Sequence, residues 1–254
     1  MLTFDNVRFQ YAVEDFSIID HLSFEVQNGE FVSIIGASGC GKSTIFRLVN
    51  KLLTPASGVI RVDGESIETK KNYCGYMPQQ DLLFPWRTVR ENLMLPMEIQ
   101  GGYSKKQMQK KADDALQSVG LADWGDKTPK ELSGGMRQRA AFARTVLTGS
   151  DLLLLDEPFS ALDYLTRLSM REWLLEQWEK EKKTVLFITH DVEEAVFLSS
   201  RILVVEQSPI THLRSIEVPA GYPRSREELR RPEILSLKEE LIGMQCIHRH
   251  GIHL

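Results

Sequence analysis

Apolar and polar residues alternate along the start of the chain, over Leu2–Tyr11 and again over Leu22–Val26. This period of two is typical of strands that bury one face. The turn signal Asn28-Gly29 follows, and after it Phe31–Ile35 is apolar at nearly every position. A strand of that kind is covered on both faces, as the strands of parallel sheets are. The start of the chain is therefore predicted to form strands of both kinds.

A period near 3.6 replaces this alternation in two later segments. A Gly-rich stretch leads into a predicted helix whose apolar face comprises Ile45, Leu48, Val49 and Leu52. From about residue 85 to 150 the pattern is again helical, and Ser104 is predicted to cap a helix that Gly120 ends. The predicted inner face of that helix comprises Met108, Ala112, Ala115, Leu116 and Val119.

Strands and helices alternate beyond residue 151. The predicted strands beyond this point are Leu152–Leu155, Val185–Ile188 and Arg201–Val205. Val59–Val62 is a further predicted strand, which precedes the helical insertion. Tyr164–Trp178 is predicted to be a helix between two of them. Such alternation indicates an α/β fold with a mainly parallel sheet, interrupted here by a helical insertion.

Composition narrows the class of protein. The chain has 254 residues, of which 42% are hydrophobic and 26% charged, and its formal net charge is −4. A weakly acidic surface has no general attraction for nucleic acid, so we expect no nucleic-acid partner. No apolar run approaches the roughly 18 residues of a membrane span, and the first residues lack a signal-peptide pattern. Three scattered cysteines, Cys40, Cys74 and Cys246, are interpreted as reduced thiols. We therefore expect a cytosolic protein whose membrane role comes through a partner.

A phosphate-binding loop is predicted over Gly36–Thr44, which fits the pattern G-x-x-x-x-G-K-[ST] between an apolar strand and an amphipathic helix. Its glycines let successive backbone N–H groups face an anion, and the dipole of the following helix adds positive potential. Lys42 would reach the β- and γ-phosphates, and the Ser43 hydroxyl would bind Mg²⁺. Cys40 is interpreted as a small filler of this loop. The segment predicts a nucleotide site.

Two acids, Asp156 and Glu157, follow the apolar strand Leu152–Leu155. The carboxyl ends of parallel strands are where such sheets bind ligands. Asp156 suits the Mg²⁺ shell through water, and Glu157 suits the polarisation of an attacking water. GTPases and small-molecule kinases share these elements, so they leave the class of NTPase open.

The segment Leu132–Arg139, with sequence LSGGMRQR, separates these classes. It reads as a second anion cradle, because Ser133 opens a helix and two glycines expose N–H groups. It resembles the signature of ABC ATPases. That resemblance implies a RecA-like P-loop core at about 1–84 and 151–220, an N-terminal antiparallel β subdomain, a helical subdomain at about 85–150, and a tail of short helices at 221–254. It also implies a homodimer in which the signature of one copy covers ATP bound by the other.

Further motifs occur in the family's order. Tyr11, near Phe9, matches the aromatic residue that stacks on adenine, and Gln79, beside Gln80, matches the glutamine that senses the γ-phosphate. The resemblance implies the catalytic residues Glu157, His190, Lys42 and Gln79. It implies nucleotide contacts by Tyr11, Gly36, Ser38, Gly39, Cys40, Gly41, Lys42, Ser43, Thr44, Ser133, Gly134, Gly135 and Asp163. It implies Mg²⁺ contacts by Ser43, Gln79 and Asp156, the last through water.

One branch of the family is indicated by Leu82–Leu93, with sequence LLFPWRTVRENL, together with Pro223–Arg226 in the tail. These segments resemble the ATPases of nitrate, sulfonate, taurine and thiamine-precursor importers. The resemblance implies two integral membrane permease subunits, an extracytoplasmic solute-binding protein acting indirectly, and a place on the cytoplasmic side of the membrane. In those systems the apolar stretch lies near the groove that receives a helix of the membrane subunit.

Three other functions stay open from the sequence. An exporter ATPase, or the motor of a lipid- or protein-release complex, would carry the same motifs. A non-transport ABC protein would usually carry a long coiled-coil insertion or two cassettes, and a soluble P-loop kinase would have no use for the signature. The tail histidines His248, His250 and His253 suggest metal binding less than they suggest a polar end of the chain. The transported solute is not determined by this chain.

Overall fold

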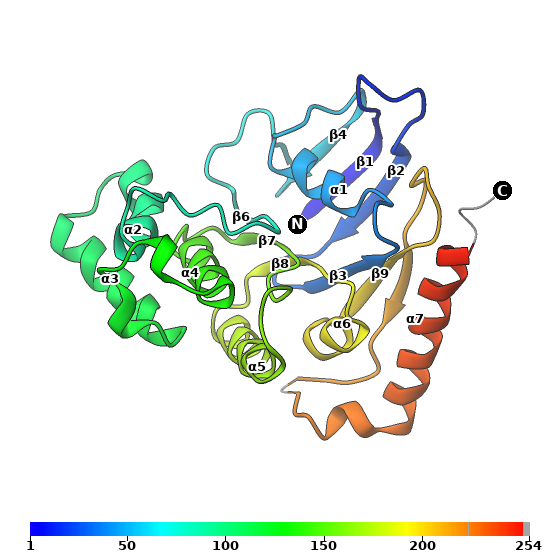
Figure 1. Cartoon of the computed structure of the whole chain (residues 1–254). Coiled ribbons are helices and arrows are strands. Elements are labelled where there is room, and N and C mark those ends of the chain that lie inside the picture. The colour runs from blue at the N-terminus through cyan, green and yellow to red at the C-terminus, as the bar shows by residue number, and fades with distance from the viewer. Residues whose placement is uncertain (223, 251–254) are drawn as a thin grey trace. The chain divides into compact units, whose positions relative to one another are not determined.

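The computed structural model describes residues 1–222 and 224–250, with side chains described up to residue 244. Two compact units make up the chain (Figure 1). The first unit contains Met1–Lys71 and the chain from Leu175 onward, and the second unit contains Asn72–Leu174. No helix in the described ranges is long and apolar enough to cross a membrane. Pro223 and His253 lie outside the described residues, as do the side chains of Cys246, His248 and His250.

The first unit contains an antiparallel sheet with the strand order β2-β1-β4-β5. Its strands are β1 (Leu2–Phe9), β2 (Ile19–Val26), β4 (Ser57–Val62) and β5 (Glu65–Ser66). Both opening alternations are thus confirmed as strands, and their apolar positions, such as Phe4, Val7 and Leu22, are buried. The N-terminal antiparallel sheet that the family resemblance implied is present.

Parallel strands form the other sheet segment of the first unit. β3 (Phe31–Gly36) pairs in parallel with β8 (Thr184–Ile188) and with β9 (Arg201–Val205). All six residues of β3 are buried, as predicted for a strand covered on both faces. A fourth strand, β10 (Arg214–Glu217), pairs antiparallel with β9 and was not predicted, because its residues are mostly polar and exposed.

Among the described residues, three α-helices belong wholly to the first unit: α1 (Lys42–Val49), α6 (Val192–Leu198) and α7 (Pro232–His250). Leu52 was expected on the inner face of the first of these, and that was wrong. The helix ends at Val49, Lys51 has a left-handed backbone with φ 57°, and Leu52 is 62% exposed.

The tail differs from the short helices that we expected in 221–254. It contains one 3-10 turn, Glu228–Arg230, and then the 19-residue helix α7. Buried Ile234, Leu237 and Leu241 pack α7 into a core cluster shared with α6 and β9, and α6 and α7 lie side by side in Figure 1. An apolar stripe of this length stabilises a long helix by burial rather than by intrinsic propensity.

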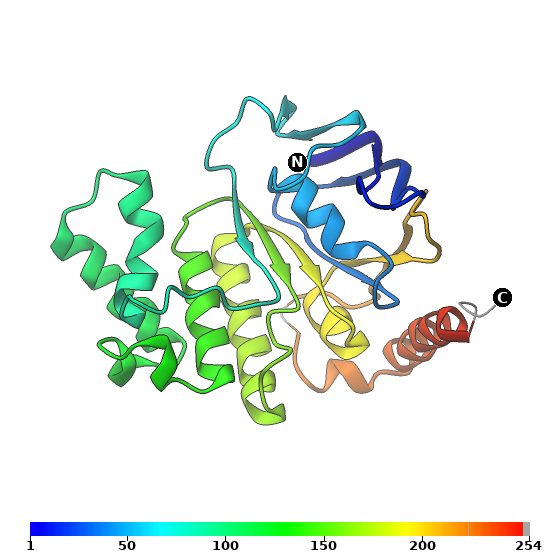
Figure 2. The same cartoon turned by 45° about the horizontal axis from the view of Figure 1, so that its top comes forward.

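The second unit contains a parallel pair of strands and a group of helices. The strands β6 (Cys74–Met77) and β7 (Leu152–Asp156) pair in register from Cys74 opposite Leu152. The helices are α2 (Val89–Gln100), α3 (Lys105–Ser118) and α4 (Gly134–Val146), with 3-10 turns at Ala122–Trp124 and Pro129–Glu131. Helix α5 (Tyr164–Glu181) begins in this unit. Figures 1 and 2 both show α2 beside α3 and α4.

The cap of α3 confirms the prediction made for Ser104. Its hydroxyl accepts from the Gln107 N–H, and the Gln107 side chain accepts from the Ser104 N–H at 2.8 Å, a capping box. Ala112, Leu116 and Val119 are buried along the inner face. The apolar stripe therefore holds α3 against its neighbours as its spacing indicated.

The Asn92 side chain joins the segment at Phe84 to the start of α2 by hydrogen bonds. This side chain is fully buried, accepts from the Phe84 N–H at 2.7 Å, and donates to the Phe84 and Thr88 carbonyls at 3.1 and 2.9 Å. We expect Asn92→Ala to lower the free energy of unfolding by about 2 kcal/mol, because it leaves backbone polar groups without partners. Chemical denaturation measures this. Gln109→Ala, which removes an exposed amide on α3, should change the free energy of unfolding little.

Candidate active site

The phosphate loop joins β3 to α1 in the first unit. Gly41 caps α1 with a left-handed backbone, φ 102°, and no side chain caps the N–H groups of the first turn. A Cβ at Gly41 would lie 2.6 Å from Ile18 Cγ2 and 3.2 Å from Ile210 Cδ1. Glycine is therefore required here for its backbone conformation and for space. A helix start without a side-chain cap favours an anion.

Lys42 lies within this loop and is only 7% exposed. Its Nζ donates to the carbonyls of Gly36 at 2.9 Å and Ala37 at 2.7 Å, and it lies 3.7 Å from Cys40 Sγ. Beside it Ser43 is half-buried and Thr44 is buried, whereas Ser38 and Gly39 at the tip of the loop are exposed. The loop thus holds a positive charge at its centre.

Tyr11 follows β1 and lies beside the loop. Its hydroxyl is 3.2 Å from Thr44 Oγ1 and accepts from Arg47 Nη1 at 3.3 Å, while its ring meets Phe9 edge-on at 4.8 Å. Phe9 is buried in the core and Tyr11 is only half-buried. Of the two aromatic residues, Tyr11 is therefore the one that offers a ring to a ligand.

Alkylation of Cys40 should block ATP binding. The thiol is partly accessible and lies against the Lys42 ammonium group, so an added group would occupy the space inside the loop. We expect nucleotide affinity and ATPase activity to fall together after stoichiometric modification with N-ethylmaleimide. Cys40→Ser treated in the same way is the control, because it retains Cys74, which is also partly accessible. Full activity with Cys40 modified contradicts the prediction.

His190 lies two residues beyond the end of β8, the parallel neighbour of β3, and its side chain is exposed. The loop around it is anchored on both sides. Thr189 Oγ1 donates to buried Glu194 at 2.6 Å and accepts from the Asp191 N–H at 3.0 Å. Asp191 in turn caps α6. His190 thus stands on a fixed turn at the carboxyl ends of the parallel strands.

The second unit brings Gln79 and Glu157 together. β7 ends in buried Asp156, and Glu157 follows it with a left-handed backbone, φ 49°. Gln79 Nε2 donates to Glu157 Oε2 at 3.3 Å across 78 residues of sequence. Gln79, rather than its neighbour Gln80, is therefore the glutamine placed at the carboxylate.

The signature segment forms the start of α4. Ser133 is the N-cap and accepts from the Met136 N–H at 3.3 Å, and Gly134 and Gly135 are the first helical residues. Asp163 accepts from the Thr166 N–H at 3.1 Å at the start of α5. Hydrogen bonding from the Thr166 side chain, and after it from the Thr166 N–H, lowers the pKa of the Asp163 carboxyl group. The second unit therefore carries a helix start suited to an anion.

One buried residue of this site escaped the sequence analysis. Gln138 on α4 contacts the backbone that follows Glu157. Its only sequence signal was membership of the Leu132–Arg139 segment, where a glutamine next to two arginines looks like a surface residue.

Comparison with known proteins decides the family. The family model described as ABC transporter matches residues 19–160, more than half of the chain. The chain belongs to the ABC transporter family. The α/β fold with its P-loop and the family resemblance are thereby confirmed, and the chain is an ATPase of this family.

Relatives of this ABC ATPase are similar over most of both chains. It is 45% identical over 233 residues to the formylaminopyrimidine import ATP-binding protein ThiZ of Halalkalibacterium halodurans, covering 92% of this chain and 90% of the relative. It is 40% identical over 209 residues to the aliphatic sulfonates import ATP-binding protein SsuB of Bacillus cereus, covering 82% of each. A solved dimeric ATP-binding cassette in a post-hydrolysis state, bound to ADP and Pi, is 28% identical, with a TM-score of 0.78 over 87% of this chain and all of that one.

Proposed function

We infer that this chain is the ATP-hydrolysing subunit of an importer, and that two copies enclose each ATP at a shared seam. The carrying observation is that the chain has two anion cradles at helix starts but only one P-loop lysine. The cradle at α1 holds Lys42, and the cradle at α4 holds no lysine in its first turn. Two different half-sites on one chain suit a head-to-tail pair of copies. The reaction is ATP + H₂O → ADP + phosphate.

The first unit supplies the residues that bind adenine and the phosphate groups of ATP. Tyr11 offers its ring to adenine, while Lys42 and the N–H groups of Gly39–Thr44 bind the β- and γ-phosphates. The Ser43 hydroxyl is an oxygen donor that suits Mg²⁺, and in the second unit the Gln79 amide oxygen and the Asp156 carboxylate are donors of the same kind. When bound, Mg²⁺ neutralises charge on the phosphate oxygens.

Hydrolysis needs a group that takes a proton from water. Glu157 has that role, its carboxylate held by Gln79 at 3.3 Å, and His190 stabilises the γ-phosphate from its fixed turn. The partner copy contributes Ser133–Gly135, whose N–H groups cover the γ-phosphate, and Asp163 crosses the seam. Catalysis here is mostly positioning and electrostatic stabilisation.

Mixing two inactive variants tests the shared seam. Lys42→Ala disables the P-loop. Gly134→Asp places a negative charge at the signature with little strain, because a Cβ there would meet nothing nearer than Arg137 Nη2 at 3.8 Å. Each variant alone should lack single-turnover hydrolysis. A mixed dimer should regain it, since one seam then combines an intact loop with an intact signature.

A double variant supplies the control for the mixing experiment. A copy that carries both Lys42→Ala and Gly134→Asp should silence wild-type copies when mixed with them, because both seams of the mixed dimer are damaged. If each site lay within one chain, the two single variants would show no recovery and the wild type would keep its activity. That result would contradict a nucleotide site shared between two copies.

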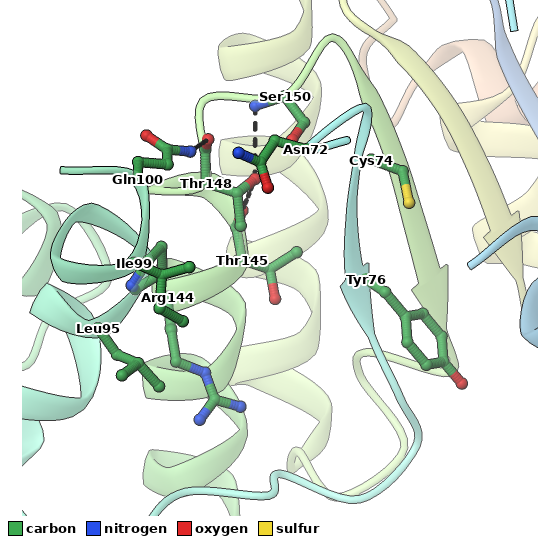
Figure 3. Close-up of a pocket in the computed structure, with 11 residues that line it drawn as sticks. Asn72, Cys74, Tyr76, Leu95, Ile99, Gln100, Arg144, Thr145, Thr148 and Ser150 are labelled. Carbon is green, nitrogen blue, oxygen red and sulfur yellow. Dashed lines mark hydrogen bonds between the residues drawn. The ribbon is translucent and has the colours of Figure 1, made fainter. Parts of the chain in front are cut away.

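A groove in the second unit suits a segment of a membrane subunit (Figure 3). It has a volume of about 320 Å³ and is lined by α2, β6 and the end of α4, including Leu95, Ile99 and Tyr76. Ile99 is 71% exposed, and nearby in the sequence Trp86 is 75% exposed and stacks on Phe84. Exposed apolar and aromatic side chains of this kind favour a protein partner. A permease subunit on the cytoplasmic side of the membrane is the partner that we propose for this groove, in a complex of two ATPases and two permease subunits.

The solute belongs to the other subunits of the importer. By analogy with the named relatives, it is a small heteroaromatic amine or an organic sulfonate, delivered to the permease by an extracytoplasmic solute-binding protein. ATP-dependent uptake of each class by the reconstituted complex separates them.

A further inference from the structure

An amide side chain lies buried beneath the turn that carries Glu157. Gln138 on α4 exposes only 3% of its surface. Its Nε2 donates to the Glu157 carbonyl and to Ser160 Oγ, at 3.2 Å each. Its Oε1 accepts from the Ala161 N–H at 2.8 Å. Both ends of the amide are therefore bonded to one turn.

This turn has a backbone that needs support. Glu157 adopts φ 49°, a region that residues with a Cβ rarely occupy. Within the turn, Ser160 also donates to the Glu157 carbonyl, from its N–H at 3.2 Å and from its hydroxyl at 3.0 Å. Such a conformation persists only where its surroundings fix it. Gln138 supplies that support from a neighbouring helix.

Helix α4 also holds the segment next to Gln79, the residue that donates a hydrogen bond to Glu157. Arg137 Nε pairs with Asp81 Oδ2 at 2.9 Å, and Arg144 donates to the Asp81 and Leu82 carbonyls at 2.9 Å each. These contacts fix the segment just after Gln79. Helix α4 thus sets the positions of both members of the Gln79–Glu157 pair.

The first turn of α4 touches the Glu157 turn as well. A Cβ at Gly135 would lie 3.3 Å from Leu162 Cδ2 and 3.4 Å from the Ala161 carbonyl oxygen. The signature glycine therefore packs against the residues that Gln138 fixes. A displacement of the signature cannot leave this turn unaffected, because close-packed groups move together.

We propose that Gln138 is a positioning residue for hydrolysis, which aims the Glu157 carboxylate and links it to the signature on the same helix. This inference rests on the proposed function. In the dimer, the signature of one copy covers the partner's nucleotide, whereas Glu157 of that copy serves its own. Gln138 then joins the two sites of the dimer through α4. It does not touch nucleotide.

Removing the amide should slow the chemical step without weakening ATP binding. In Gln138→Ala we expect single-turnover hydrolysis to fall by about 100-fold, the scale produced by a misplacement of 1 Å. The affinity of the monomer for a fluorescent ATP analogue should stay unchanged, because Tyr11 and Lys42 belong to the first unit and the signature contacts nucleotide only in the dimer. In the Glu157→Gln background, Gln138→Ala should cause no further loss, since the carboxylate it aims is already gone.

Controls separate positioning from folding. Gln117→Ala removes an exposed amide on α3 and should leave the rate unchanged. If Gln138→Ala does not fold, Gln138→Glu carries the test, because it keeps the acceptor for Ala161 and loses the donor to Glu157. An unchanged rate, or an equal further loss in the Glu157→Gln background, overturns the inference. Failure of Glu157→Gln alone to dimerise with ATP would instead count against the proposed function.

Discussion

Glu157→Gln is expected to slow turnover by about 10²–10⁴-fold and to trap an ATP-bound dimer. The substitution removes the group that takes the proton from water, a contribution of about 10²–10⁴ in rate. It keeps the size of the side chain, and the left-handed backbone at this position is held by contacts to the Glu157 carbonyl rather than to its carboxylate. Nucleotide affinity should therefore persist. Steady-state phosphate release and size-exclusion chromatography with light scattering, with ATP and Mg²⁺ present, measure the two effects.

The matched control for this variant is Asp114→Asn. It also neutralises one acid of the second unit, but on an exposed position of α3. It should turn over ATP as the wild type does and should not accumulate as a dimer. Wild-type turnover in Glu157→Gln would contradict the catalytic role of Glu157. If the variant stays monomeric with ATP and Mg²⁺, the proposal that two copies share each nucleotide site is wrong.

The elements of the fold that could be predicted are those specified by the residues within the element itself. The strands β3 and β7 are apolar at nearly every position, and α3 combines a capping box with an apolar stripe. Short elements carried too little signal. β6 has four residues, including a glycine, and α6 has seven, several of them typical of strands. Burial against α7 and the Asp191 cap decide that α6 is helical.

The residues of the candidate site also fall into two groups, those specified by neighbouring residues in the sequence and those specified by contacts between distant segments. Lys42 and Ser133 could be assigned from motifs, because a phosphate loop and a helix cap are made by consecutive residues. The choice between Gln79 and Gln80 needed the contact with Glu157, which joins segments far apart in sequence. Gln138 could not be found, because its burial arises from packing of α4 on a turn that the sequence does not place.

Lys42→Ala is expected to abolish productive ATP binding. The ammonium group sits inside the loop, where it now donates to the Gly36 and Ala37 carbonyls, and it is nearly buried. A charged hydrogen bond contributes about 1.5–3 kcal/mol, so losing two contacts to phosphate oxygens should raise the dissociation constant by roughly 100-fold or more. Equilibrium binding of a fluorescent ATP analogue measures this directly. Lys42→Arg should not restore affinity, because a planar guanidinium cannot occupy the same position.

Lys51 offers a matched control, because its ammonium group is held in the same manner. Its Nζ donates to the Ile67 carbonyl at 2.8 Å and to the Lys70 carbonyl at 2.7 Å, within the same unit but outside the phosphate loop. Lys51→Ala also removes two charged hydrogen bonds to carbonyls, although from an exposed side chain, and it should leave ATP affinity at the wild-type value. Equal losses of affinity in the two variants would mean that Lys42 acts only by holding the loop together. A loss confined to Lys42→Ala assigns its charge to the nucleotide.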